Sequence, residues 1–419
     1  MLAPAPLPRR AFARLFRFVW GDDVDPSIRG LLAFSFAETL AFASLWTYMA
    51  IWAIDELGAS NGQLGVALLL NSIASAVFGY VGGHLSDRLG RKPLMVTGLT
   101  LQTALVLGLV FAEGVLPGLV LLVAVAAAAG VSIGASQALV PDLVEPARQE
   151  EAFAAVRVAS NLGVVVGPPV GGFLLWGERW GLFFLGLAAL GALALAVALR
   201  WVPRRGDFSP ESPPGRRSLG VIARDRVFLV FLGSTVLAYV VYVGFEVALP
   251  VAAVDSYGLA PSTWGFLIVI NAAAVAFLQL RLTKRVARYS PALRLATAIP
   301  LMGLPFLLLT VDTSLAAIVV VIALFVVGEM LWVPTSQAIV ARLAPADVRG
   351  AYMGAFSASF SIGFALGPLV LLQLRAAAGD DAMWLFLATV SLVAALAGVL
   401  AARGAEPGAE PALEGAPVR

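Results

Sequence analysis

The sequence has no cysteine and a single histidine, His84. Disulfide bonds and thiolate metal sites are therefore excluded, and we expect neither a histidine-based metal centre nor any other metal site. Charged residues are scarce too: they make up 13% of the 419 residues, whereas soluble domains contain about a quarter. A shortage of charge along the whole chain is typical of a polytopic membrane protein.

Apolar residues are abundant instead, at 60%, and the mean hydropathy is +0.91. A membrane-spanning helix needs about 20 predominantly apolar residues. Twelve stretches of suitable length lie at 30–53, 63–83, 93–112, 116–140, 152–176, 181–202, 227–252, 263–282, 291–311, 314–340, 350–374 and 382–402. The sequence therefore predicts an all-α polytopic membrane protein with twelve transmembrane helices.

A change of composition divides the chain in its middle. Residues 203–226, PRRGDFSPESPPGRRSLGVIARDR, are rich in Pro, Gly, Ser and charge, which is typical of a linker. The last residues, 404–419, are of low complexity, which predicts disorder. We predict a cytoplasmic segment at 1–29, six-helix bundles at 30–202 and 227–403, a cytoplasmic linker at 203–226 and a disordered cytoplasmic tail at 404–419.

The positions of the cations predict the orientation, because Lys and Arg accumulate in cytoplasmic loops. With both termini in the cytoplasm, 26 of the 28 Lys and Arg residues fall on that side or at its helix ends. The exceptions are Arg179 and Arg375. We therefore expect a multi-pass protein of the inner or plasma membrane with cytoplasmic termini.

The chain also repeats itself at an offset of 200 residues. That offset pairs Asn71 with Asn271, Arg88 with Arg288, the SQA at 136–138 with the SQA at 336–338, Gly163 with Gly363, and Gly167-Pro168 with Gly367-Pro368. Matches that keep one register over this length predict two pseudo-symmetric halves of like orientation. The expected symmetry axis runs along the membrane normal, as in transporters with parallel repeats.

The densest group of charges is GGHLSDRLGRKP at 82–93, between the second and third spans. It resembles the loop motif G-x-L-x-D-R-x-G-R-K of the major facilitator superfamily, with motif residues Gly83, Asp87, Arg88, Gly90, Arg91 and Lys92. The resemblance extends over roughly residues 30 to 403 and implies a transporter that works by alternating access. It also implies that Asp87 meets the start of the eleventh helix near Gly350 and holds the cytoplasmic side shut. The alternative role is a simple topology anchor.

The second half carries a degenerate copy of this motif, QLRLTKRVARYSP at 279–291. It keeps several cations, but Ala287 stands where the first copy has Asp87. The copy can anchor topology, but it lacks the carboxylate needed for the same contact.

The predicted fifth helix contains a second motif. Its residues resemble the antiporter motif G-x-x-x-G-P-x-x-G-G of the superfamily, and they are Gly163, Gly167, Pro168, Gly171 and Gly172. In the family this motif is associated with exporters that exchange substrate for protons, while a generic packing and kink motif is the alternative. One feature departs from the drug exporters: the fourth span, 120–140, has no arginine, and Arg157 is the nearest intramembrane cation.

Three carboxylates lie inside predicted spans: Glu38, Glu246 and Glu329. Charges within a membrane are costly and commonly functional, and loss of water favours the protonated carboxyl. We predict that these three residues bind protons or substrate, with a structural hydrogen-bonded glutamate as the alternative. Polar or aromatic residues that could line a cavity or bond between helices are Asn71, Gln137, Asn161, Tyr242, Asn271, Trp332 and Gln337.

Together these features predict a secondary active transporter, with proton-coupled efflux of hydrophobic or amphipathic small molecules as the leading function. A proton-coupled transporter of a specific metabolite, such as a sugar, amino acid or organic acid, is the first alternative. A membrane enzyme or a non-transporting receptor is disfavoured, because the short loops show no nucleotide-binding loop and no nucleophile elbow. The expected partners are a small-molecule substrate, protons and the lipid bilayer, without cofactor or nucleic acid, and we expect a monomer.

Overall fold

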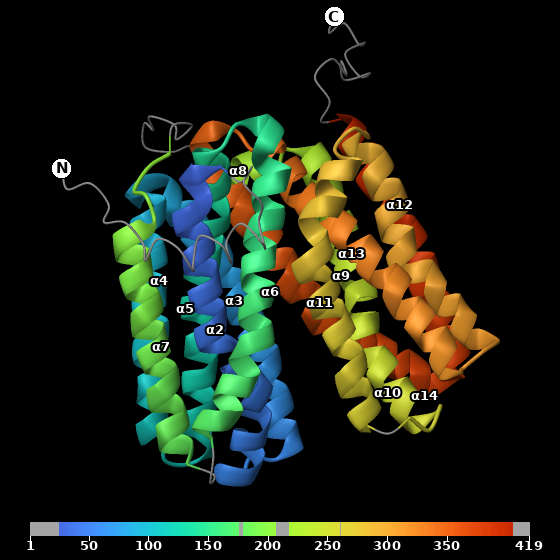
Figure 1. Ribbon diagram of the computed structural model, residues 1–419, viewed down its shortest axis with the longest axis horizontal. Helices are drawn as coiled ribbons and strands as arrows, with labels where there is room; N and C mark the ends of the chain where they lie inside the picture. Colours follow the sequence, from blue (N-terminus) through green and yellow to red (C-terminus); the bar gives the residue numbers. More distant parts are fainter. Residues whose placement is uncertain (1–24, 176–178, 207–217, 260, 405–419) are drawn as a thin grey trace, which may run out of the picture.

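The computed structural model describes residues 25–175, 179–206, 218–259 and 261–404. Within these ranges every regular element is a helix. Figure 1 shows two groups of helices side by side, with α2 to α7 in one and α9 to α14 in the other. The prediction of an all-α protein is confirmed.

The first group contains six long helices. They are α2 (Arg29–Ile51), α3 (Asn61–Leu89), α4 (Arg91–Gly108), α5 (Val115–Leu143), α6 (Gln149–Leu174) and α7 (Trp180–Trp201). Shorter turns adjoin them at η1 (Pro26–Ile28), η2 (Trp52–Glu56), η3 (Leu109–Phe111) and η4 (Pro146–Arg148). Each predicted span of the first half corresponds to one long helix, and α3 and α5 continue several residues beyond their apolar runs.

The second group begins after a short helix, α8 (Ser218–Ile222), which lies within the predicted linker. Its elements are α9 (Arg226–Val243), η5 (Gly244–Ala248), α10 (Leu249–Asp255), α11 (Pro261–Val286), α12 (Pro291–Gly303), η6 (Leu304–Thr310), α13 (Leu315–Leu343), η7 (Ala346–Val348) and α14 (Arg349–Gly404). The elements α9, η5 and α10 follow one another without a loop. The long α14 holds two helices that meet at Gly379, where a φ of 85° interrupts the helix.

Ten helical segments in the described ranges are long and apolar enough to cross a membrane. One of them, Ala346–Gly404, contains the two helices that meet at Gly379, and α11 covers the predicted eighth span. The twelve predicted spans are therefore all helical. The loop predicted between the last two spans is reduced to a kink.

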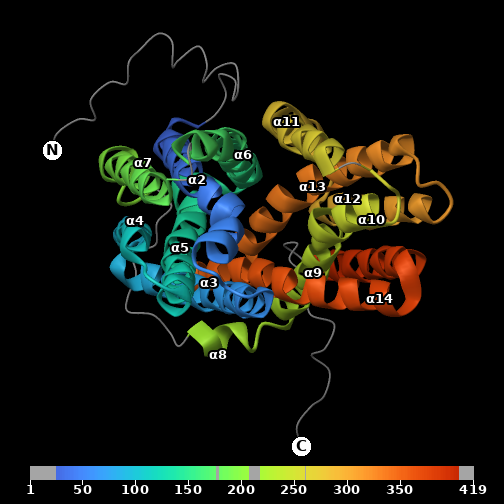
Figure 2. The ribbon, with the colours of Figure 1, turned by 90° about the horizontal axis from the view of Figure 1, so that it is seen from below.

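The two groups meet mainly along two pairs of helices. Figure 2 shows α3 beside α14 and α6 beside α11, and both pairs are in contact. The offset of 200 residues turns α3 into α11 and α6 into α14, so the repeat relates one contact to the other. At the first contact Gly83 lies directly against the backbone of Gly350 and Gly354, where a side chain on either helix would collide.

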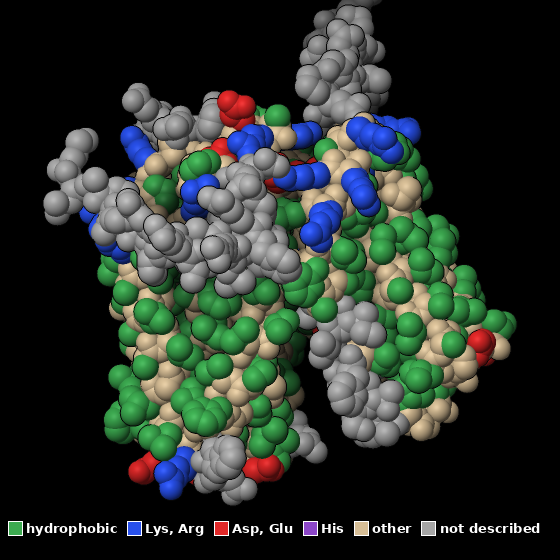
Figure 3. Space-filling model, in the orientation of Figure 1, with side chains coloured by type: hydrophobic (Ala, Val, Ile, Leu, Met, Phe, Trp, Pro, Cys, Tyr) green, Lys and Arg blue, Asp and Glu red, His purple; other side chains and the backbone are tan. Residues whose placement is uncertain are grey.

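The two ends of the molecule differ in charge. Figure 3 shows Lys and Arg side chains gathered at one end, which we call the cationic end; α3 and α13 finish there and α14 begins there. The flanks between the ends are covered with hydrophobic side chains, as expected for contact with lipid (Figure 3). The surface is hollowed between the two groups toward the opposite end (Figure 3). The helix groups are therefore joined at the cationic end and separated at the other.

Candidate functional site

A polar cluster lies in the apolar interior around Glu329 of α13, which is only 1% exposed. Its carboxylate forms an ion pair with Arg157 of α6. The Tyr242 hydroxyl of α9 donates to Glu329 Oε1 at 2.7 Å, and the Asn271 amide of α11 donates to Oε2 at 2.8 Å. Because Arg157 belongs to the first helix group and the other members to the second, this cluster joins the two groups through a carboxylate.

Physical chemistry explains why three donors converge there. A lone carboxylate in a low-dielectric interior costs several kcal/mol, so it must find a cation and hydrogen bonds. On the same helix the Asn161 amide donates to the backbone carbonyl of Arg157 at 2.9 Å. Among the described residues, Arg157 Nε has no hydrogen-bond partner. The guanidinium thus keeps one donor available for another acceptor.

Glu246 belongs to the same cluster. It lies on η5, a π-helical turn that interrupts the span formed by α9 and α10, and it is half-buried. It follows Tyr242, whose hydroxyl donates to Glu329, by four residues, about one helical turn. Single π-turns inside helices are frequent at functional sites, because they turn side chains out of the regular helical positions. The structure therefore brings two of the three predicted carboxylates together.

Glu38 lies apart from them, in the first group. It is half-buried on α2, and the Ser132 hydroxyl of α5 donates to Glu38 Oε1 at 3.0 Å. Its contact with Ser132 is a hydrogen bond to a neutral group, in contrast to the ion pair at Glu329. The two sites consequently sit in different halves of the molecule and have different electrostatics.

Aromatic rings adjoin the cluster on α9, α13 and α14. Tyr239 packs edge-on against Trp332 and Phe360, with ring centroids 4.8 and 5.2 Å apart. Phe360 stacks at an angle on Phe364, which in turn lies 5.9 Å from Tyr242. Trp332, a predicted cavity residue, is 1% exposed and contributes packing in this conformation. Phe360 is 44% exposed, so the exposed rim of this aromatic wall is formed by α14.

At the cationic end, Asp87 occupies the place that the motif implies. Its carboxylate accepts hydrogen bonds from the backbone N–H groups of Gly350 and Ala351, at 2.7 and 3.1 Å. These are the unpaired donors of the first turn of α14, and the helix dipole adds to the attraction. Arg91 donates to Asp87 at 2.6 Å and holds the carboxylate in position.

The other members of the motif fix this arrangement. Arg91 also donates to Asp142 of α5 at 2.9 Å, and Arg349 of α14 donates to the other oxygen of Asp142 at 2.9 Å. Lys92 donates to the carbonyls of Leu199 and Val202 at the end of α7, both at 2.7 Å. Gly90 separates α3 from α4 with a φ of 93°, and Arg88 is exposed.

A second set of contacts crosses between the groups at the repeat-related place. Glu150, in the first turn of α6, forms an ion pair with Arg294 of α12 and accepts from the Thr335 hydroxyl of α13 at 3.0 Å. Its neighbour Glu151 pairs with Lys284 of α11 at 3.5 Å. At the offset of 200, Glu150 corresponds to Gly350. The loop of the second half has Ala287 in place of a carboxylate such as Asp87. At this contact the carboxylate is instead supplied by Glu150, which lies at the start of α6, the helix that corresponds to α14.

The glycines of the fifth-span motif lie against α2. A Cβ on Gly163 would come within 2.9 Å of the Leu40 nitrogen and the Phe36 carbonyl oxygen, and Gly167 faces Ala43 and Leu40 in the same way. Near Pro168 the Ser44 hydroxyl donates to the Gly167 carbonyl at 2.6 Å. Gly171 and Gly172 continue the contact against Ser44 and Tyr48.

This geometry predicts the effect of a single methyl group. Gly163→Ala should destabilise the protein by about 1–3 kcal/mol, because the backbone atoms opposite cannot move without separating α2 from α6. Gly181→Ala on α7 is the matched control, since no atom lies within 4 Å of its added Cβ. Thermal unfolding in detergent should show a lower midpoint for the first variant only. Equal midpoints would contradict the packing role.

The sequence model of the Major Facilitator Superfamily matches residues 31–368. That range contains α2 to α13 and the first turns of α14. The chain belongs to the Major Facilitator Superfamily. It is therefore a multi-pass membrane protein of a family of transporters, not of enzymes.

Curated relatives include named antiporter and resistance proteins. The multidrug resistance protein MdtH of Klebsiella pneumoniae is 27% identical over 380 residues, which cover 88% of this chain and 92% of the relative. The Na(+), Li(+), K(+)/H(+) antiporter of Planococcus maritimus is 24% identical over 381 residues, which cover 83% of this chain and 89% of the relative.

Solved structures of the superfamily share the fold. The human organic anion transporter MFSD10 (TETRAN) has a TM-score of 0.69 at 18% identity, with 88% of this chain and 98% of that one covered. The E. coli fucose:proton symporter FucP has a TM-score of 0.67 at 17% identity, with coverage of 91% and 99%. At these identities the likeness concerns the fold alone.

The remaining predicted residues of this superfamily member lie apart from the cluster or have side-chain oxygens that accept no hydrogen bond from a described residue. Asn71, Gln137 and Gln337 each bury a side-chain oxygen that has no hydrogen-bond partner among the described residues. Asn71 is the repeat partner of Asn271, but Ala129 stands where Glu329 stands in the second half. No Glu329-like carboxylate is therefore available to Asn71 on α5.

The sequence prediction missed several contact residues. Arg157 was recognised only as the nearest intramembrane cation, yet it is the ion-pair partner of Glu329. Asp142 and Glu150 were missed because carboxylates near helix ends are common and usually solvated. The repeat contained a signal for Glu150. At the offset of 200 residues Glu150 corresponds to Gly350, which lies at the start of the helix that Asp87 contacts in the other half.

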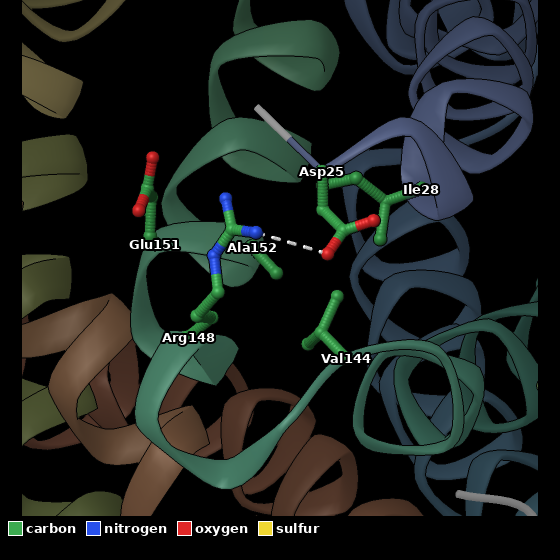
Figure 4. Close-up of a pocket in the computed structure, with 6 residues that line it drawn as sticks. All are labelled: Asp25, Ile28, Val144, Arg148, Glu151 and Ala152. Atoms are coloured by element: carbon green, nitrogen blue, oxygen red, sulfur yellow. Dashed lines mark hydrogen bonds and ion pairs between the residues drawn. The ribbon is translucent and has the colours of Figure 1, made fainter. Parts of the chain in front are cut away.

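A pocket at the cationic end is too small to bind a substrate. Figure 4 shows Asp25 facing Arg148, which donates to it at 3.1 Å, and the enclosed volume is about 10 Å³, one water molecule at most. Partial burial acts to raise the pKa of Asp25. Hydrogen bonds from Ser27 and the charges of Arg148 and Arg29 outweigh this effect, so the pKa of Asp25 is lowered. The pair secures the start of α2 against α6.

Proposed function

We propose that this protein is a proton-coupled antiporter that exports hydrophobic or amphipathic small molecules. The observation that carries the proposal is the ion pair between Arg157 and Glu329, which crosses from one helix group to the other inside the membrane. The names of the MdtH and cation/H(+) antiporter relatives support both export and proton exchange.

The cationic end is the cytoplasmic end in this proposal, because cytoplasmic loops are rich in Lys and Arg. The start of α2 and the end of α14 both lie toward that end (Figure 1). Since the groups are joined there and separated at the other end, the structure corresponds to an outward-facing state. The contacts of Asp87 and Glu150 act as the cytoplasmic gate.

Proton binding and gate opening are then linked through one carboxylate. A proton that arrives from the outer hollow neutralises Glu329, which weakens its bond to Arg157 and loosens the connection between the groups. Glu246 interacts with Glu329 and lies one helical turn beyond Tyr242, toward the end opposite the cationic end. It is therefore placed to pass the proton. Substrate binding from the cytoplasm reverses the step and expels the proton.

The walls near the cluster fit an apolar substrate with a cationic group. Near the cluster, Phe360 and its aromatic neighbours offer ring faces. Half-buried Glu38, which lies apart from the cluster in the first helix group, offers a carboxylate that is bonded to a neutral hydroxyl. The likeness to FucP concerns the fold and gives no support to the sugar alternative.

Replacing Glu38, Glu246 and Glu329 one at a time with Gln tests the coupling. Each variant should transport less under an imposed pH gradient, with the largest loss at Glu329, because an amide cannot exchange a proton. Efflux in proteoliposomes at several pH values is the measurement, and exposed Glu113→Gln is the control. Full efflux in all three variants at every pH would overturn the coupling proposal.

A further inference from the structure

A groove of about 730 Å³ lies on the lipid-facing surface where α6 ends and α7 begins. Its walls include Phe173 from α6 and Leu182, Leu185 and Ala189 from α7. Their spacing of three and four residues places the α7 members on one helix face. All four side chains are exposed, Phe173 by 71%, so the groove opens outward rather than into the protein. Its volume lies within the range of small-molecule sites, roughly 300–1,000 Å³.

Among the described residues that line the groove, Arg179 is the charged one, and it lies at the mouth of the groove. Arg179 precedes the first residue of α7 and lines the groove at the end of the molecule away from the cationic end. From Arg179 to Ala189 is ten residues, roughly 15 Å along a helix, or about half of the hydrocarbon core. The groove therefore has a cation at headgroup depth and apolar walls through one leaflet.

Arg179 differs from the other cation that the sequence places at this end. Arg375 donates to Asp380 at 2.6 Å and to Asp255 at 3.3 Å, so protein carboxylates neutralise it. Among the described residues, no corresponding ion pair holds Arg179. A cation at that depth attracts the phosphates of anionic lipids.

The repeat supplies a natural comparison. At the offset of 200, Leu185 corresponds to Leu385, which is exposed in the same way on α14. There, however, Gly379 stands for Arg179, Phe386 for Gly186 and Thr389 for Ala189. The second half thus keeps the exposed leucine of this face but lacks the cation and has larger side chains in place of Gly186 and Ala189.

We propose that this groove binds one anionic phospholipid, with its phosphate on Arg179 and one acyl chain along Leu182, Leu185 and Ala189. The lipid fills the space beside Phe173, the residue directly after the fifth-span motif, and so supports the junction of α6 with α7. Lipid recognition here does not depend on the proposed transport, because none of these residues belongs to the polar cluster.

Lipid competition on the purified full-length protein tests the proposal. The protein is mixed with equal amounts of phosphatidylglycerol and phosphatidylcholine, and the lipid that stays bound is measured by native mass spectrometry. One Arg near the surface is worth about 1 kcal/mol, so we expect roughly a fivefold preference for phosphatidylglycerol. Arg179→Gln should lower this preference by the loss of one tightly bound phosphatidylglycerol, and Arg179→Lys should keep it.

Filling the groove separates this site from lipid bound elsewhere. Ala189→Trp should reduce the tightly bound phosphatidylglycerol, whereas its repeat partner Thr389→Trp should leave it unchanged. The proposal is overturned if the unmodified protein shows no preference, if Arg179→Gln keeps it, or if both Trp variants retain the same lipid.

Discussion

Glu329→Gln should reduce gradient-driven transport by at least tenfold, the largest functional loss expected from any single substitution here. The amide keeps the shape of the carboxyl but can neither exchange a proton nor neutralise Arg157, its buried partner. Breaking a buried ion pair from one side costs about 3–5 kcal/mol. The variant should therefore lose stability together with coupling, and substrate efflux from proteoliposomes and thermal unfolding in detergent measure the two effects.

A double substitution separates these effects. Arg157→Gln with Glu329→Gln removes both charges, so no uncompensated ion remains in the interior. This variant should recover much of the stability but none of the coupling, and substrate should only equilibrate down its own gradient. Transport that still follows the pH gradient in the double variant would exclude Glu329 as the coupling site.

The second large effect is expected at the cationic end, where Arg294→Glu should open the gate. The substitution replaces the ion pair with Glu150 by the repulsion of two carboxylates, at positions where the Arg294 and Glu150 side chains are 6% and 12% exposed. Even after allowance for partial solvation, a loss of about 2–3 kcal/mol shifts the population of the closed state by tenfold or more. Because the chain has no cysteine, spin labels at Leu89→Cys and Tyr289→Cys report the separation of the two groups specifically.

Reversal of both charges is the matched control for this prediction. Glu150→Arg with Arg294→Glu restores opposite charges at the same two positions, and the label distance should return to that of the closed state. Asp87→Asn provides a comparison at the repeat-related contact and should open the gate as well. A swapped variant that stays open would show that Glu150 and Arg294 do not act as a pair.

Much of the fold could be predicted from the sequence, because membrane-spanning helices have a strong local signal in their long apolar runs. Long apolar runs located the helices that the structure shows, and their ends moved only by several residues. The offset of 200 residues by itself relates α3 to α11 and α6 to α14. The placement of Asp87 at the start of α14 was implied by the resemblance of its motif to that of the superfamily, and it is consistent with the attraction between a carboxylate and a helix N-terminus.

The partners of charged residues were decided by tertiary structure alone. No periodicity relates Arg157 to Glu329, which are 172 residues apart, because their meeting depends on how α6 and α13 rotate and approach across two bundles. The same holds for Glu150 and Arg294, which replace a carboxylate that the repeat lost at Ala287. The sequence determined which carboxylates are expensive to bury. Only the packing of the helices decided that Glu329 would meet a buried cation and that Glu38 would meet a hydroxyl.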